Sequence, residues 1–289
     1  MADIIDGAKI AADIFDELTA RVEALKAKGS TPTLAAVLVG DDPASAMYVR
    51  MKRRDARKKA GVESILHHMP ERTEADDLED IIDGLNADPS VHGILLQIPL
   101  PKHLDEDHFL RRIDPAKDVD GLHPFNQGLL MQGRPRFVSA TPAGVKEMLV
   151  RSGIPIEGQH VVVVGRSVLV GRPLSVLLSN KAENGNATVT LCHTRTRDLS
   201  SITKQADILV VAAGVPKFIG AADVSEGTVV IDVGTTVMPD GTYLGDVDFD
   251  AVSQKARAIS PVPGGVGPMT RVMLIANTVA AAEAAAANA

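Results

Sequence analysis

The sequence predicts an α/β protein of two α/β domains, the second a Rossmann-type, doubly wound parallel sheet, with a cleft between the domains. A chain of 289 residues with 45% hydrophobic content is long enough to bury two ordinary cores. Short apolar runs typical of buried strands alternate with stretches of helical periodicity, in two successive series. Residues 134–141 have little apolar content and separate the two series, so they mark the passage between domains.

The first series opens with a helix, because apolar residues recur at helical spacing over residues 10–25 and Gly29 follows as a left-handed cap. Residues 34–39 are typical of a buried strand. Asp42 and Pro43 then supply an N-cap and a first-turn proline for a helix ending near Gly61. Three more elements continue the alternation: an extended stretch at 64–68, a helix capped by Thr73 and running to residue 85, and an apolar strand at 91–98.

The second series begins with a helix at Thr141 and Pro142. Its expected strands are residues 161–164, 188–191, 208–211 and 229–233. After a segment rich in proline and glycine, an alanine-rich helix runs from about Thr270 to the end and is apolar all round, so it must pack on other elements. We expect it to return to the first domain. The predicted domains are therefore 1–138, completed by helix 270–289, and 139–269.

The composition excludes several classes of function. The net charge of −7 is spread along the chain without runs of like charge, which argues against a nucleic-acid or membrane partner. Apolar runs end far short of the ~20 residues that a membrane span needs. The single cysteine cannot form an internal disulfide, no secretory signal is evident, and no metal site is expected. A cytoplasmic protein that binds small soluble ligands is the simplest interpretation.

A nucleotide site is predicted where the strand at 161–164 runs into a glycine-containing turn and a helix. The pattern is Gly165-x-Ser167-x-x-x-Gly171-x-Pro173, which lacks the second glycine of the general dinucleotide fingerprint. Gly165 permits a tight turn, while Gly171 and Pro173 open a helix whose free N–H groups favour a pyrophosphate. The alternative is an ordinary tight connection between a strand and a helix.

NADP is predicted in preference to NAD from the end of the next strand. The residues there are Cys192-His193-Thr194-Arg195, with no carboxylate where NAD-specific folds hold the ribose hydroxyls. Arg166 on the first turn, with Thr194 and Arg195 on the second, can meet a 2′-phosphate. The alternative is that Arg195 and the nearby Arg197 are solvated surface charges.

A chemical site is indicated by Tyr48 and Lys52, which stand four residues apart and so lie on one face of the second helix. Many other cations surround them, so a solvated helix face is the alternative. These neighbours are Arg50, Arg53, Arg54, Arg57, Lys58 and Lys59.

Five separated segments together carry a resemblance to a known family. They are YVRMK at 48–52, GILLQIPLP at 93–101, DPAKDVDGLHPFNQG at 114–128, GRSVLVGRP at 165–173 and SPVPGGVGPMT at 260–270. In this order, and over nearly the whole chain, the sequence resembles the bifunctional methylenetetrahydrofolate dehydrogenase/cyclohydrolase family. The resemblance implies NADP-dependent oxidation of 5,10-methylenetetrahydrofolate to the 5,10-methenyl compound, and hydrolysis of that product to 10-formyltetrahydrofolate. It places the chain in one-carbon metabolism, which serves purine, methionine and histidine biosynthesis.

The resemblance also assigns roles to residues. Lys52 would be the catalytic lysine with Tyr48 shaping the pocket, Gln97 would contact that lysine, and Asp120 would grip the pterin ring. The loop beside the folate would be Pro263, Gly264 and Gly265, and the cofactor contacts would include Gly214 and Thr235. A homodimer joined through the nucleotide domains is implied. From the residues alone, Gln97 could satisfy local backbone groups, Asp120 could be a turn residue and the proline-glycine loop only a bend.

The two reactions need different help from the protein. Hydride leaves a carbon flanked by two nitrogens without any proton transfer, so this step requires orientation. Ring opening adds water and requires proton transfer. A lysine at its reference pKa of about 10.4 would be charged and would repel the cationic intermediate. We therefore expect burial and a hydrogen bond from Gln97 to favour neutral Lys52, while Asp120 holds the pterin through two parallel hydrogen bonds.

Two other functions are compatible with this fold. A different two-domain NAD(P)-dependent dehydrogenase, acting on an amino or hydroxy acid, would need an acid/base such as His123 near the nicotinamide. A catalytically silent nucleotide-binding or scaffold protein is the other. The presence of Tyr48, Lys52, Gln97 and Asp120 argues against the second.

Overall fold

The computed structural model describes residues 1–287, which form two compact units. The small-sheet unit comprises 13–129, 135–140 and the residues from 271 onward. The large-sheet unit comprises 1–12, 130–134 and 141–270. Among the described residues, no helix is long and apolar enough to cross a membrane.

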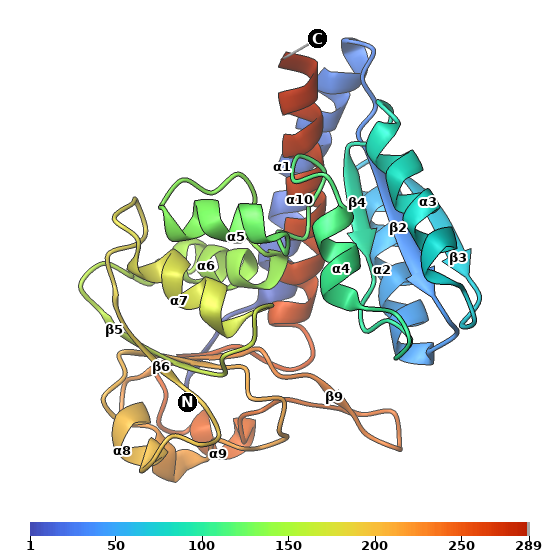
Figure 1. Ribbon diagram of the computed structural model, residues 1–289. Coiled ribbons are helices and arrows are strands. Elements are labelled where there is room, and N and C mark those ends of the chain that lie inside the picture. The colour runs from blue at the N-terminus through green and yellow to red at the C-terminus, as the bar shows by residue number, and fades with distance from the viewer. Residues whose placement is uncertain (288–289) are drawn as a thin grey trace. The chain divides into compact units, whose positions relative to one another are not determined.

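The small-sheet unit is built on a parallel sheet in the order β3-β2-β4 (Figure 1). The strands are β2 (Thr33–Val39), β3 (Glu63–Met69) and β4 (Gly93–Leu96). The central strand β2 is buried along its whole length, which agrees with its uninterrupted apolar sequence. Alternate β2 side chains pack against helix α3 (Ala75–Ala87) through Leu78, Ile82 and Leu85. The strands predicted at 34–39, 64–68 and 91–98 are therefore confirmed, the last in a shorter form.

Helix α2 (Pro43–Lys59) follows β2 and begins as predicted. The side chain of Asp42 accepts a hydrogen bond from the amide of Ser45 at 2.7 Å, and Pro43 occupies the first turn. The prediction that Thr73 caps α3 is wrong. Glu74 is the residue before that helix, and the Thr73 hydroxyl instead donates to the carbonyl of Pro70 at 2.6 Å.

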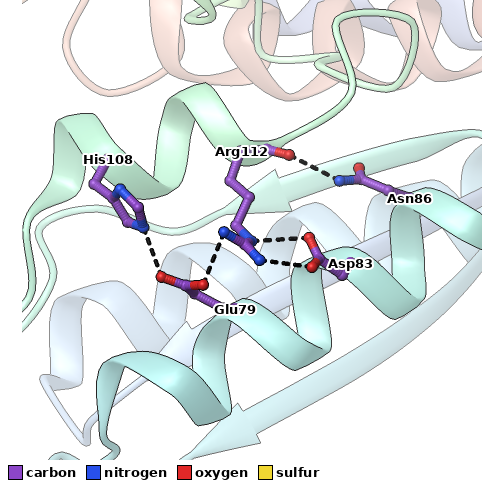
Figure 2. A network of polar contacts seen from close by, with 5 residues as sticks. All are labelled: Glu79, Asp83, Asn86, His108 and Arg112. Atoms are coloured by element: carbon purple, nitrogen blue, oxygen red, sulfur yellow. Dashed lines mark hydrogen bonds and ion pairs between the residues drawn. The ribbon is translucent and has the colours of Figure 1, made fainter.

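Helix α4 (Glu106–Arg112) is tied to α3 by a polar network, shown in Figure 2. Arg112 forms ion pairs with Asp83 at 2.7 Å and with Glu79 at 2.8 Å. Asn86 donates to the carbonyl of Arg112 at 2.8 Å, and His108 contacts the second oxygen of Glu79. The network fixes the point from which the chain continues into the segment that carries Asp120.

The large-sheet unit contains a parallel sheet in the order β1-β11-β8-β7-β5-β6. Its strands are β1 (Asp3–Ile4), β5 (His160–Val164), β6 (Thr188–Cys192), β7 (Ile208–Val211), β8 (Val229–Asp232) and β11 (Ala258–Ile259). Strand β5 pairs with β6 on one side and with β7 on the other, so the chain reverses its direction of travel across the sheet at β5. This is the topological switch point at which doubly wound sheets bind ligands. The predicted Rossmann-type sheet is confirmed.

The helices of the large-sheet unit include α6 (Ala140–Arg151), α7 (Gly171–Ser179), α8 (Leu199–Thr203), the 3-10 turn η1 (Ala221–Asp223) and α9 (Phe249–Val252). A short antiparallel pair, β9 (Thr236–Val237) with β10 (Tyr243–Leu244), follows β8. Helices α1 (Gly7–Ala27), α5 (Pro124–Met131) and α10 (Val266–Ala287) contribute residues to both units. The N-terminal residues cluster with the large-sheet unit because β1 pairs with β11.

Candidate active site

Lys52 is the centre of the candidate chemical site in the small-sheet unit. Its Nζ donates to Oε1 of Gln97 over 3.3 Å, which joins α2 to the end of β4. Lys52 as a whole is half-buried. Burial of its amine lowers the Lys52 pKa, and the negative charge of nearby Asp120 opposes that shift. The structure therefore brings together the lysine, the amide and the carboxylate that the sequence nominated, while Tyr48 lies half-buried one turn earlier on α2.

The expected direction of the bond between Gln97 and Lys52 is wrong. The side-chain amide of Gln97 donates to the carbonyl of Ile98 at 2.7 Å, so it is the Gln97 oxygen that faces the lysine. An accepting oxygen favours the charged amine over the neutral one. Burial alone is thus the cause that lowers the Lys52 pKa.

Asp120 lies in a segment that a buried carboxylate holds in place. Asp118 is 2% exposed and accepts hydrogen bonds from the amides of Leu122 and His123 and from the side chain of Asn126. Burial raises the pKa of Asp118 to about 6, against the effect of these bonds. This role of Asp118 is not visible in the sequence, because the bonds that reveal it form only when the segment folds back on Asp118.

Gly121, directly after Asp120, has a φ of +68° and packs closely on the chain at Ser139. A Cβ at this position would lie 2.8 Å from the amide nitrogen of Ser139, so a larger residue would displace the segment. The glycine therefore contributes to the position of the neighbouring Asp120.

Most of the cations that surround Tyr48 and Lys52 in the sequence are exposed to solvent. Arg50, Arg54, Arg57, Lys58 and Lys59 are exposed, whereas Arg53 is half-buried and contacts Ser64 on β3. Five of these side chains line an open cavity of about 440 Å³, namely Arg50, Arg53, Arg54, Arg57 and Lys58.

The candidate nucleotide site lies at the carboxyl end of β5. Gly165 has a φ of +131°, and a Cβ there would lie 2.1 Å from the carbonyl oxygen of Ala212. A Cβ on Gly171 would lie 1.8 Å from the carbonyl oxygen of Gly165. Both positions therefore require glycine. Together they produce a compact turn whose backbone a ligand can approach.

Helix α7 starts at this turn without a side-chain cap. The residue before it, Val170, offers no side-chain hydrogen bond to the first turn, and Pro173 stands within that turn. Ser167 is exposed and its hydroxyl accepts from the amide of Val170 at 3.1 Å. The amide of Arg172 donates to the carbonyl of Ser167 at 3.1 Å and Pro173 has no N–H, so it is the positive end of the helix dipole that favours a phosphate here. With the two glycines of the turn, the residues present fit a dinucleotide.

The residues predicted to bind the 2′-phosphate come directly after two neighbouring strands, β5 and β6. Val164 pairs with Cys192 in the register of β5 and β6, and the amide of Gly165 donates to the carbonyl of Cys192. Arg166, Thr194 and Arg195 follow these strand ends and are all exposed. Parallel strands end at the same edge of a sheet, so the three side chains arise from adjacent positions.

The remaining predicted residues lie in loops of the large-sheet unit. Gly214 follows β7 with a φ of +69°, and Thr235 follows β8 and is exposed. In the loop 263–265, the carbonyl of Gly264 accepts from the amide of Ala8 at 2.8 Å, and Gly265 lies against Gly7.

His123, the acid/base that a different dehydrogenase would use, is engaged with backbone groups at both ring nitrogens. Its Nε2 contacts the carbonyl of Arg111 at 3.1 Å, and its Nδ1 accepts from the amide of Phe125 at 2.9 Å. Within residues 1–287, no group of three or more His, Cys, Asp or Glu side chains is placed to hold a metal ion.

Two family models match successive parts of the chain. The family model described as the catalytic domain of tetrahydrofolate dehydrogenase/cyclohydrolase matches residues 5–120, and the model of its NAD(P)-binding domain matches residues 139–286. The bifunctional protein FolD of Dehalococcoides mccartyi is 54% identical over 291 residues, which covers 99% of this chain and 98% of that protein.

Two solved structures extend the similarity to three dimensions. The bifunctional FolD methylenetetrahydrofolate dehydrogenase/cyclohydrolase of Campylobacter jejuni has a TM-score of 0.94 and 44% identity, covering 98% of this chain and 99% of that one. The Trypanosoma brucei enzyme, solved with NADP and an inhibitor, has a TM-score of 0.91 and 38% identity, covering 98% of both chains.

Proposed function

The chain belongs to the tetrahydrofolate dehydrogenase/cyclohydrolase family, and from this premise we propose that it catalyses two successive reactions. It oxidises 5,10-methylenetetrahydrofolate to 5,10-methenyltetrahydrofolate with NADP, and it hydrolyses the methenyl compound to 10-formyltetrahydrofolate. The observation that carries the proposal is the buried amine of Lys52 beside Gln97 and Asp120. The reactions belong to one-carbon metabolism and supply purine, methionine and histidine biosynthesis.

In the first reaction the protein acts by orientation. Bound NADP supplies the acceptor for the hydride that leaves the methylene carbon. The turn at Gly165 and Gly171 and the N-terminal end of α7 bind the pyrophosphate, and Asp120 holds the pterin ring through paired hydrogen bonds. No proton is transferred, so no acid or base is required in this step.

In the second reaction Lys52 moves a proton. Its lowered pKa makes the neutral amine accessible, and this amine accepts a proton from the water that adds to the methenyl carbon. The same proton is returned to the ring nitrogen as the carbon–nitrogen bond breaks, and the proton of the added hydroxyl is released to solvent as the formyl carbonyl forms. Gln97 fixes the position of Nζ by accepting a hydrogen bond from the charged form. Tyr48 shapes the pocket from the preceding helical turn.

The preference for NADP rests on Arg166, Thr194 and Arg195. These exposed side chains follow the ends of β5 and β6, and they offer two cations and a hydroxyl to a 2′-phosphate. Gly214 and Thr235, in the loops after β7 and β8, complete the cofactor contacts.

Three broader features belong to the same proposal. Along the sequence, residues 1–138 with helix 270–289 supply the folate-binding catalytic domain and residues 139–269 the NADP-binding domain, although residues 1–12 and 130–134 cluster with the large-sheet unit. Pro263, Gly264 and Gly265, in the loop that precedes the last helix, also contact the folate. The protein works in the cytoplasm without nucleic-acid partners, as a homodimer joined through the nucleotide domains. Equilibrium sedimentation at micromolar concentration tests the dimer, and a sharp monomer would contradict it.

A spectroscopic assay of the purified protein tests the proposed function. With NADP and methylenetetrahydrofolate, we expect reduced cofactor to accumulate. Methenyltetrahydrofolate added without cofactor should lose its absorbance faster than in buffer. Turnover of an amino or hydroxy acid with no turnover of the folates would instead favour the other class of dehydrogenase, although both ring nitrogens of His123 are occupied.

A further inference from the structure

Two buried aspartates of the large-sheet unit pack in a reciprocal way. Asp232 ends β8 and Asp246 follows β10, with exposed fractions of 3% and 0%. A Cβ on Gly234 would lie 2.1 Å from Cγ of Asp246, and a Cβ on Gly245 would lie 1.9 Å from Oδ2 of Asp232. Each carboxylate thus fills the space left by a glycine close in sequence to the other aspartate. We call Asp232, Gly234, Gly245 and Asp246 the aspartate clasp.

The clasp joins three segments of backbone at the carboxyl edge of the sheet. Asp232 accepts hydrogen bonds from the amides of Gly234 at 3.0 Å, Asp246 at 2.9 Å and Val247 at 2.9 Å. Asp246 in turn accepts from the amide of Gly214 at 2.7 Å. The loops after β7 and β8 are therefore both anchored to the same pair of carboxylates.

Burying the two carboxylates of the clasp costs folding free energy, which a purely structural role would not require. Among residues 1–287, no cation is among the groups that shift the pKa of either carboxyl, and Oδ1 of Asp246 is buried without a hydrogen-bond partner. Burial raises the pKa of both carboxyls, that of Asp232 to about 7, where the charge of Asp246 adds to the effect. Buried acids kept in this state often lie at functional sites.

The loops that the clasp anchors are those that carry two of the cofactor contacts. Gly214 is bound directly by Asp246, and Thr235 follows Gly234, whose Cα lies against the Asp246 carboxylate. Since a hydride donor and acceptor must meet at short distance, small shifts in these loops change the rate and the affinity.

We propose that Asp232 and Asp246 are positioning residues for the dehydrogenase reaction, which hold the loops of Gly214 and Thr235 in the conformation that binds the nicotinamide nucleotide. The proposal rests on the proposed function. The two aspartates act through the backbone of these loops and make no contact with the folate. Their effect is confined to the step that uses NADP, because ring opening needs no nicotinamide and depends on Lys52, Gln97 and Asp120 in the small-sheet unit.

Two variants of one residue separate positioning from folding. Asp246→Asn keeps the size of the side chain and one oxygen for the Gly214 amide, while Asp246→Ala removes the bond altogether. We expect Asp246→Ala to raise KM for NADP by about tenfold, the effect of losing one hydrogen bond to a charged group. The effect of Asp246→Asn should be smaller. For both, KM for the folate and the cyclohydrolase activity without NADP should stay within about twofold of wild type. Asp250→Asn, an exposed aspartate of the same unit, is the matched control.

A third variant tests the reciprocal packing. Gly234→Ala places a methyl group where the Asp246 carboxylate lies, so it should reproduce the NADP effect of Asp246→Ala, and the double variant should be little worse than either single one. Equal loss of both activities in Asp246→Asn, or a wild-type KM for NADP in Asp246→Ala, would overturn the proposal. A wild-type protein without either folate activity would instead refute the proposed function.

Discussion

Replacing Arg271 with methionine should destabilise the small-sheet unit, because it removes the closest partner of a buried carboxylate. Asp55 on α2 is 1% exposed, and Nε of Arg271 on α10 donates to its Oδ2 at 2.7 Å. Burial works against the charge of Asp55, yet the bond from Arg271 and the nearby cations hold its pKa below the ordinary value. Because Tyr48 and Lys52 lie on the same helix, this contact also supports the chemical site.

The size of the expected loss in unfolding free energy depends on the cations that remain near Asp55 in the variant. Removing one member of a buried ion pair costs about 3–5 kcal/mol, because the other charge is left buried. Arg54 at 3.2 Å and Lys59 at 3.5 Å still approach Asp55, but both side chains are about half exposed to solvent. We therefore expect Arg271→Met to cost about 3 kcal/mol, the lower end of that range, and to lower Tm by about 6–12 °C.

Thermal and urea unfolding followed by far-UV circular dichroism measure this loss. The matched control is Arg21→Met, which breaks a contact of similar length to Glu283, also on α10. Both side chains of that pair are about 40% exposed, so its loss should cost at most about 1 kcal/mol. If the two variants lost equal stability, or Arg271→Met lost less than about 1 kcal/mol, the reasoning from burial would be refuted.

Three further predictions concern the large-sheet unit. Arg195→Ala should raise KM for NADP by about tenfold and leave KM for NAD unchanged, as measured by steady-state kinetics, since it removes a cation that only the 2′-phosphate needs; an equal rise for both cofactors would contradict this. Gly171→Ala should abolish NADP binding in calorimetry while preserving cyclohydrolase activity, because the methyl group would lie 1.8 Å from the carbonyl oxygen of Gly165; normal binding would show that the turn is not a close-approach site. The raised pKa of Asp232, about 7 against an ordinary 3.8, means that the folded protein retains a proton that the unfolded chain loses. Its contribution to stability is present below pH 3.8 and is lost as the pH rises to about 7, so the unfolding free energy relative to Asp232→Asn should fall by about 4 kcal/mol over that window in urea titrations; a flat difference would contradict the shift.

Much of the fold could be predicted because local patterns carry it. The apolar runs of β2, β5 and β7 have no other stable place than a buried parallel strand, and Asp42 with Pro43 fixes the start of α2 by local chemistry. The two-residue strands β1 and β11 could not be predicted, because each exists only through its pairing with a distant segment. The residue type of Thr73 predicts a helix cap, but its hydroxyl donates to the carbonyl of Pro70 instead.

Some residues of the candidate site could likewise be predicted from the sequence, and others could not. Lys52, Gln97 and Asp120 were nominated from motifs and come together in the structure. The residues that hold the site in place were missed, because their partners are far along the chain: Arg271 and Asp55 are 216 residues apart. Buried carboxylates such as Asp118 and Asp232 look like ordinary loop residues in a sequence, and only their burial shows otherwise.

Lys52→Met, assayed for both reactions, most directly tests the claim that hydride transfer needs only orientation whereas ring opening needs the amine of Lys52. We expect cyclohydrolase activity to fall by about 10²–10⁴-fold, the usual contribution of a positioned acid/base, while the dehydrogenase kcat changes by no more than a few-fold. Lys58→Met, an exposed lysine on the same helix, should leave both activities unchanged. Ring opening that survives in Lys52→Met, or loss of hydride transfer alone, would contradict the role of the buried lysine.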